Sequence, residues 1–201
     1  MSSIQHGEFR VVNLLKNRTG GYEMAVVKPD FYLVCGLSGV GKTTFSKKYA
    51  KNTGLRYLGA DEFYAKVNGS EHIHTNKFEV WIELFKAIHE CEQAGIGCVV
   101  DSNALSASGR DEFINWFPGF NHHIIFIDAD ERLRQTNNQS RERKIPESIM
   151  MSMRSKLEHP VWNTMDKRWQ SLTCIHNSNN HFLVVDVKGK PSYTSVKSLV
   201  W

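Results

Sequence analysis

One eight-residue motif limits what this chain can fold into more than any other feature of the sequence. The pattern G-x-x-x-x-G-K-[ST] is matched in full by GLSGVGKT at residues 36–43. An apolar run at 31–35 precedes it, and a helical pattern at 43–52 follows it. A strand that turns through glycines into a helix is the context in which this motif binds phosphate. The motif therefore predicts an α/β sheet with a phosphate-binding loop at the carboxyl end of one strand.

Each position of the motif has a physical role in holding a nucleotide. Glycines let backbone N–H groups turn toward phosphate oxygens, and the start of the following helix adds partial positive charge. Lys42 can reach the β- and γ-phosphates, while the Thr43 hydroxyl can bind Mg²⁺. We therefore expect ATP and Mg²⁺ as cofactors, with nucleotide contacts from Gly36, Ser38, Gly39, Val40, Gly41, Lys42, Thr43 and Thr44.

Apolar runs that alternate with helical patterns predict the rest of the fold. Runs at 31–35, 55–60, 97–101, 124–128 and 182–187 lack polar alternation, as strands buried on both faces do. Helical patterns cover 43–52, 76–94, 110–117, 130–138 and a stretch opened by Pro146. This order predicts a three-layer α/β fold with a parallel sheet and helices on both faces. Residues 1–29, with a hairpin around Thr19, are expected to be an N-terminal appendage to a domain at 30–201.

Composition is ordinary for a soluble globular domain. Hydrophobic residues make up 41% and charged residues 23% of the 201 positions, and the net charge is +4, which excludes wholesale disorder and a small disulfide scaffold. The four cysteines form no C-x-x-C pair, as expected for reduced thiols. No apolar run approaches the roughly 18 residues of a membrane span, and the first residues lack a signal-peptide core. We expect a cytoplasmic protein without a membrane partner.

Polar residues follow two of the predicted strands. Asp61 and Glu62 come after the run at 55–60, and Asp101, Ser102 and Asn103 end the run at 97–101. Asp61 can serve as the base that takes a proton from an acceptor hydroxyl, or it can cap a helix. Asp101 can hold a water on Mg²⁺, or it can orient Thr43. Ser102 and Asn103 can hold the acceptor, or they can satisfy local backbone groups.

A basic stretch lies between Asp128 and Pro146. Cations placed over the triphosphate stabilise the charge that spreads onto a transferred phosphoryl group. We expect a lid around 132–145, with Arg141 and Arg143 as its functional side chains and Arg132 and Arg134 on a solvated helix face.

The motifs of other nucleotide-binding classes are missing from the sequence. The Asn-Lys-x-Asp that reads guanine is absent, because Asn76-Lys77 is followed by Phe78-Glu79. Asp101 is followed by Ser102 rather than by the Glu with which ATPases commonly activate water. Phosphoryl transfer to a bound acceptor remains. A structural metal at His72 and His74 or at His122 and His123 is not expected, because neighbouring ligands are missing.

In these motifs the chain resembles the P-loop polynucleotide 5′-hydroxyl kinases of phage type and related small P-loop kinases. The resemblance covers about residues 31–160 and rests on GLSGVGKTT, ADEFY at 60–64, VVDSN, IIFID, NQSR at 138–141, Pro146 and LEHP at 157–160. It implies a five-stranded parallel kinase sheet and the 5′-hydroxyl of a polynucleotide as acceptor. By the same resemblance Asp61 is the general base, Asp101 with Ser102 and Asn103 forms the metal and acceptor segment, Arg141 belongs to the lid, and Arg110 contacts the acceptor.

The sequence also departs from that family. An arginine often follows the base by three residues to grip the acceptor's phosphate, and Tyr64 stands here instead. The segment Asp61–Tyr64 also fits the D-x-F-Y of uridine-kinase-like enzymes. Two alternatives therefore stay open: a kinase of a small metabolite, nucleoside or antibiotic, and an ATP-binding sensor with slow hydrolysis.

Overall fold

The computed structural model describes residues 12–16, 22–70, 73, 75–142, 144–179 and 181–190. Near its start, β1 (Val12–Lys16) and β2 (Tyr22–Val26) pair antiparallel in a two-stranded sheet of their own. The hairpin expected here has its turn at residues 17–21, which lie outside the described residues.

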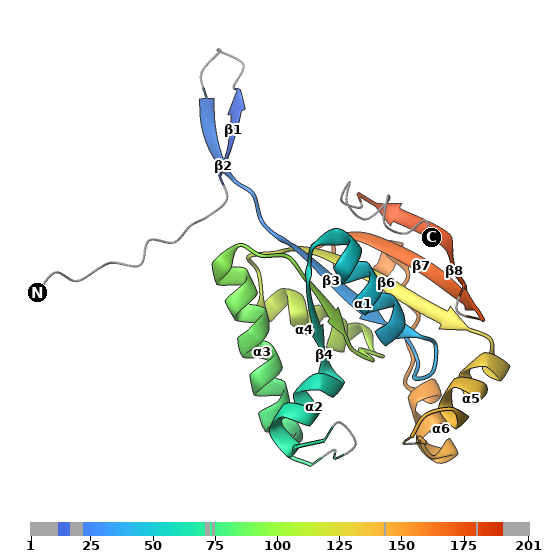
Figure 1. Cartoon of the computed structure of the whole chain (residues 1–201). Coiled ribbons are helices and arrows are strands. Elements are labelled where there is room, and N and C mark those ends of the chain that lie inside the picture. The colour runs from blue at the N-terminus through green and yellow to red at the C-terminus, as the bar shows by residue number, and fades with distance from the viewer. Residues whose placement is uncertain are drawn as a thin grey trace, which may run out of the picture.

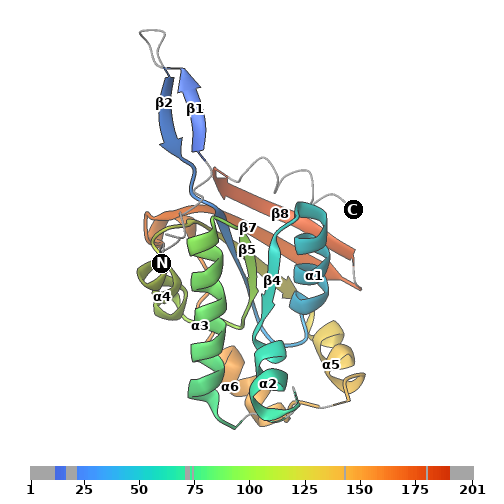
Figure 2. The same cartoon turned by 60° about the vertical axis from the view of Figure 1, so that its left-hand side comes forward.

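A six-stranded sheet forms the centre of the molecule, with helices on both of its faces (Figures 1 and 2). The strands follow one another across the sheet as β4 (Arg56–Gly59), β5 (Cys98–Asp101), β3 (Asp30–Cys35), β6 (Asn121–Ala129), β7 (Trp169–Ser178) and β8 (His181–Gly189). The first five are parallel and β8 is antiparallel to β7. The predicted three-layer α/β fold is therefore confirmed, with one strand more than expected.

The last two strands correct the sequence prediction. The run at 182–187 was expected to be a buried parallel strand, yet it lies in β8 at the sheet edge, where Leu183 is 56% and Val185 is 64% exposed. The fifth parallel strand is β7, whose sequence WQSLTCIHNS has too many polar residues to stand out as an apolar run. The apolar composition of a segment can indicate a strand, but it does not show whether other elements pack on that strand and bury it.

Alternate residues of the central strands feed two separate cores. Phe31 and Leu33 of β3 join the core under α3 (Lys77–Ala94) and α4 (Ala107–Trp116), while Tyr32 and Val34 join the core under α1 (Lys42–Thr53). Both faces are thus apolar, which explains why these strands show no alternation. The remaining helices are α2 (Ala60–Asn68), α5 (Glu131–Gln139), α6 (Glu147–Ser155) and the short 3₁₀ helix η1 (Trp162–Thr164).

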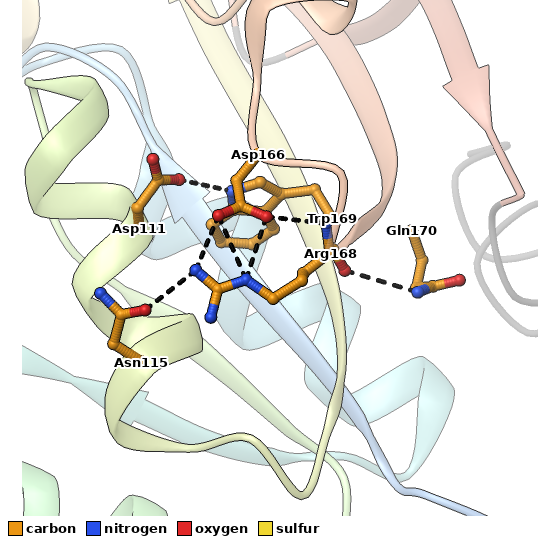
Figure 3. Close-up of polar contacts among 6 residues, drawn as sticks. All are labelled: Asp111, Asn115, Asp166, Arg168, Trp169 and Gln170. Atoms are coloured by element: carbon orange, nitrogen blue, oxygen red, sulfur yellow. Dashed lines mark hydrogen bonds and ion pairs between the residues drawn. The ribbon is translucent and has the colours of Figure 1, made fainter.

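A polar cluster fixes the path of the chain from η1 into β7 (Figure 3). Arg168 pairs with Asp166 and donates to Asn115 Oδ1 at 2.9 Å. The indole N–H of Trp169 donates to Asp111 Oδ1 at 2.8 Å. Asp111 and Asn115 belong to α4, so this cluster ties the start of β7 to the helix layer. Within the described residues, no helix is both long and apolar enough to cross a membrane.

Candidate active site

The phosphate-binding loop connects the end of β3 to the start of α1, as its motif predicts. Its glycines adopt conformations that other residues rarely reach: φ is 140° at Gly36, 87° at Gly39 and 92° at Gly41. A Cβ at Gly36 would collide with the backbone oxygen of Ile127, and one at Gly39 would lie 2.8 Å from the backbone oxygen of Arg134. Residue types at these positions are therefore fixed both by backbone conformation and by the close approach of β6 and α5.

Lys42 lies in the first turn of α1 and is 9% exposed. Its Nζ donates to the backbone oxygen of Leu37 at 2.9 Å, across the mouth of the loop. Burial lowers the pKa of Lys42, and the charge of Arg141 acts in the same direction, whereas the Asp101 carboxylate opposes both. The ammonium group is thus placed inside the loop with a buried carboxylate as its counter-charge.

Thr43 and Asp101 meet at the base of the loop. The Thr43 hydroxyl donates to Asp101 Oδ2 at 2.6 Å, and Tyr57 OH donates to the same oxygen at 3.4 Å. Burial raises the pKa of Asp101, while Lys42 and the Thr43 hydrogen bond oppose that shift. Mg²⁺ prefers hard oxygen ligands and is commonly held in phosphate sites by one or two protein groups. A hydroxyl and a carboxylate side by side beside the loop fit that requirement.

The loop opens into a hollow of about 280 Å³. The segment expected to form a lid reaches this hollow, because Arg141 lines it together with loop residues. The lining consists of Gly39, Gly41, Lys42, Thr43, Thr44, Asn137, Ser140 and Arg141. Arg143, the second arginine expected in the lid, lies outside the described residues. The structure thus brings the guanidinium of Arg141, which follows α5, to the phosphate loop.

Asp61 is exposed in the first turn of α2, directly after β4. The residue at the N-terminal cap of α2 is Gly59, and no side chain caps this helix, so Asp61 is not the cap. Because β4, β5 and β3 are parallel, Asp61 lies at the same edge of the sheet as the phosphate loop, and its charge contributes to the pKa values of Lys42 and Asp101.

Ser102 and Asn103 lie in the loop after β5, and their backbones are bonded to β3 and its end. Ser102 N donates to Val34 O at 3.1 Å, and Gly36 N donates to Asn103 O at 3.3 Å. Arg110, expected at the acceptor, is 3% exposed and uses Nη1 to hold the carbonyls of Ala104 and Leu105 at 3.1 and 3.0 Å. It shapes the loop that carries Ser102 rather than reaching into the open hollow.

The α5 helix behaves differently from the solvated face that its sequence suggested. Arg132 is exposed as expected, but Arg134 is 4% exposed, pairs with Glu131 at 2.6 Å and points Nε toward Ser38 O at 3.4 Å. Sequence reasoning also missed Asn137 at the hollow and Asn177 at the end of β7. A signal existed for Asn177, since polar residues at strand ends line the crevice of α/β sheets, but β7 itself was not recognised.

Other candidate groups of the sequence have ordinary structural roles. Across the described residues, no group of three His, Cys, Asp or Glu side chains could hold a metal; His72 and His74 are outside that part of the chain. Trp169 is buried in the core beneath α4. The thiols of Cys35, Cys91, Cys98 and Cys174 are all free.

Several solved structures share this fold. The chain is similar to a sugar kinase from Janibacter sp. HTCC2649, with 21% identity and a TM-score of 0.55 over 74% of this chain and 85% of that one. It is similar to a gluconokinase from Sinorhizobium meliloti 1021, with 21% identity and a TM-score of 0.52 over 74% and 82%. A chain of the Pnkp1/Rnl/Hen1 RNA repair complex matches with 14% identity and a TM-score of 0.57, over 65% of this chain and 44% of that one.

Fold and loop together define an α/β P-loop domain with the fold of small kinases. The family model that matches residues 32–160 is described as an AAA domain. That span is more than half of the 201 residues, and the chain belongs to this family.

Proposed function

We propose that this protein is a Mg²⁺-dependent kinase that transfers the γ-phosphoryl group of ATP to an acceptor hydroxyl, and that the acceptor is the 5′-hydroxyl of a polynucleotide. The observation that carries the proposal is the joint placement of Lys42, the Thr43–Asp101 pair and Arg141 around one hollow. Hydrolysis needs only a water near the phosphate, whereas transfer also needs a base and a place for the acceptor. Asp61, which follows β4, and Ser102, which follows β5, supply candidates for both, and these two strands lie on one side of β3.

Each residue of the candidate site has its own role in the proposed phosphoryl transfer. The loop N–H groups and Lys42 hold the phosphates, and Arg141 faces the group that is transferred. Thr43 and Asp101 would hold Mg²⁺, which neutralises phosphate charge when bound. Asp61 accepts the proton of the acceptor hydroxyl as the oxygen bonds to phosphorus and the bond to ADP breaks. Ser102 and Asn103 help to place the acceptor.

Buried thiols at Cys35, Cys91 and Cys98 support a reducing, cytoplasmic setting.

The polynucleotide acceptor rests on the sequence resemblance, and the structural likeness to part of an RNA repair complex agrees with it. The likeness to a sugar kinase and a gluconokinase, and Tyr64 in place of an arginine, favour a small metabolite as the second candidate.

An acceptor screen distinguishes the polynucleotide from the small metabolite. Purified protein with ATP and Mg²⁺ is given 5′-hydroxyl DNA and RNA oligonucleotides, or a panel of nucleosides and sugars, and ADP release is measured. Release that depends on the oligonucleotides supports the proposal. Slow release that ignores every acceptor would instead indicate a sensor.

The base assignment is tested by Asp61→Asn with Glu62→Gln as a matched control. Both residues lie in the first turn of α2 and are exposed, but Glu62 pairs with Lys47 at 3.0 Å. Asn keeps the size of Asp61 and cannot take the proton, so turnover should fall on the order of 10²–10⁴-fold with ATP affinity nearly unchanged. Glu62→Gln should remain near wild type. Unchanged turnover in a folded Asp61→Asn protein would exclude Asp61 as the base.

A further inference from the structure

Three consecutive carbonyl groups of the phosphate loop are each held from outside by a different side chain. Arg134 Nε donates to Ser38 O at 3.4 Å, Asn137 Nδ2 donates to Gly39 O at 2.7 Å, and Asn177 Nδ2 donates to Val40 O at 2.8 Å. The donors come from α5 and from the end of β7, 96 to 137 residues away from the loop in sequence. We call Arg134, Asn137 and Asn177 the outer clamp.

The outer clamp acts on the N–H groups of the loop through the geometry of the peptide bond. In a trans peptide the carbonyl and the following N–H point in opposite directions. Holding the carbonyls of residues 38, 39 and 40 outward therefore turns the N–H groups of Gly39, Val40 and Gly41 inward. Those three inward N–H groups are what a phosphate-binding nest consists of.

Burial restricts two of the three side chains of the outer clamp. Asn177 is fully buried and Arg134 is 4% exposed. Space is equally tight: a Cβ at Gly39 would meet the backbone of Arg134, and one at Gly41 would lie 2.7 Å from Asn177 Nδ2. A loop of glycines would otherwise have many backbone states, and fixing each residue on binding would cost conformational entropy. The clamp removes that cost in advance.

We infer that Arg134, Asn137 and Asn177 are positioning residues that preorganise the loop for the phosphates of the nucleotide. This inference deepens the proposed function and rests on it, because both concern the same nucleotide. Each of the three gives one donor to a backbone carbonyl of the loop; Asn137 also lines the hollow, whereas Arg134 and Asn177 are not among its lining residues. Polyphosphate affinity should therefore depend on the side chains that hold the carbonyls of the loop.

The test uses Asn137→Ala, with Thr136→Ala as a matched control on the same helix. Thr136 precedes Asn137 in α5 and is exposed. Binding of inorganic tripolyphosphate and of ADP, each with Mg²⁺, is measured by titration calorimetry, and melting temperature is measured in parallel. One lost hydrogen bond of this kind should weaken both affinities about tenfold, which corresponds to about 1.4 kcal/mol. Thr136→Ala should bind like wild type.

The readouts separate a positioning role from a structural one. Alanine favours helix, so Asn137→Ala should melt close to wild type while it binds tripolyphosphate more weakly. A purely structural residue would lower the melting temperature and leave the affinity of the folded protein unchanged. If Asn137→Ala does not fold, Arg134→Lys keeps the cation beside Glu131 but loses the Nε donor, and about threefold weaker binding is expected from its longer bond.

The outcome for the clamp is distinct from the outcome for the proposed function. Wild-type protein that binds ATP and phosphorylates an acceptor, together with clamp variants that bind tripolyphosphate as tightly as wild type, would overturn the clamp and leave the function standing. Wild-type protein that binds neither ATP nor tripolyphosphate would overturn the proposed function and, with it, the clamp.

Discussion

Lys42 is the residue whose loss tests the candidate site most directly. It is buried, and its ammonium group lies across the mouth of the loop. A preorganised charge at a developing transition state contributes about 3 kcal/mol or more, so Lys42→Ala should reduce phosphoryl transfer at least about a hundredfold. Lys51→Ala, an exposed change in the last turn of the same helix, is the control. Near-normal ADP production by folded Lys42→Ala would show that this loop is not the active site.

His122 gives a residue-scale prediction about stability. Its ring packs against Phe31, Phe120 and Trp169, with centroids 5.2, 6.2 and 5.8 Å away, and its Nε2 has no partner among the described residues. Burial lowers the pKa of His122 to about 4 from its ordinary value of 6.5, and the charges of His123, Lys28 and Arg168 act in the same direction.

The sign of the pH effect follows from that shift. The folded protein binds the His122 proton more weakly than the unfolded chain, so stability is retained above pH 6.5 and lost as pH falls toward 4. The full shift corresponds to about 3 kcal/mol. In His122→Phe, which keeps an aromatic ring, the free energy of unfolding should fall less between pH 7 and pH 4.5 than it does in wild type. Urea unfolding at the two pH values measures the difference. Equal losses in both proteins would mean that His122 is not the group responsible.

At the scale of elements, α5 connects the phosphate loop to the lid. Asn137 faces the loop, and its neighbour Asn138 makes two hydrogen bonds to the backbone of Ile145, each 2.9 Å long. Asn138 thereby closes the segment between α5 and α6, which carries Arg141 to the hollow. The two neighbouring amides thus hold different parts of the site.

Asn138→Ala should loosen the lid without disturbing the loop. Because Arg141 would then be held less firmly over the transferred group, kcat should fall about tenfold, while the affinity for ADP with Mg²⁺ stays close to wild type. Gln139→Ala, an exposed change next to it, should have little effect on either quantity. Kinetics at saturating ATP and binding measurements on both variants provide the check. Loss of ADP affinity with normal kcat would contradict this division of roles.

Local signals predicted most of the elements. The helices α1 and α3 end at Gly54 and Gly95, both left-handed with φ of 72° and 67°, as glycines after apolar periodic segments suggest. In β7, Ser171 and Asn177 are polar yet buried, because His123 and the backbone oxygen of Val40, both distant in sequence, form hydrogen bonds with them. These hydrogen bonds form only in the folded chain, so no local sequence pattern predicts that this segment is a buried strand.

The same limit applies to the site. A contiguous motif carries Lys42 and Thr43, and strand ends point to Asp61 and Asp101, so these residues could be named from the sequence. Asn177 bonds to Val40 across 137 residues, and only tertiary packing shows that contact. Arg134 looked like part of a charged surface because its sequence neighbours are polar, whereas the approach of α5 to Gly39 buries it.

On the scale of the whole molecule, β3 divides the site into two halves. On one side β5 and β4 end in Asp101 and lead into Asp61, the residues assigned to the metal and the acceptor. On the other side β6 leads into α5, and β7 ends near Asn177, the residues assigned to the loop and the lid. The parallel order of the strands brings both halves to one edge of the sheet. With Asp61 as the proposed base, an acceptor would approach from the side of β4 and α2.

This direction of approach makes the response to salt informative about the acceptor. Around the acceptor half Arg110 is committed to loop carbonyls, and Tyr64 stands where an arginine was expected. A polynucleotide must then draw on cations spread over a chain whose net charge is +4. Its bound phosphates release counterions, so KM for a 5′-hydroxyl oligonucleotide should rise steeply between about 50 and 200 mM salt, while kcat at saturation changes little. ADP release at several salt concentrations measures this, with the KM for ATP as an internal control. A flat response together with turnover of an uncharged sugar or nucleoside would assign the protein to the metabolite kinases instead.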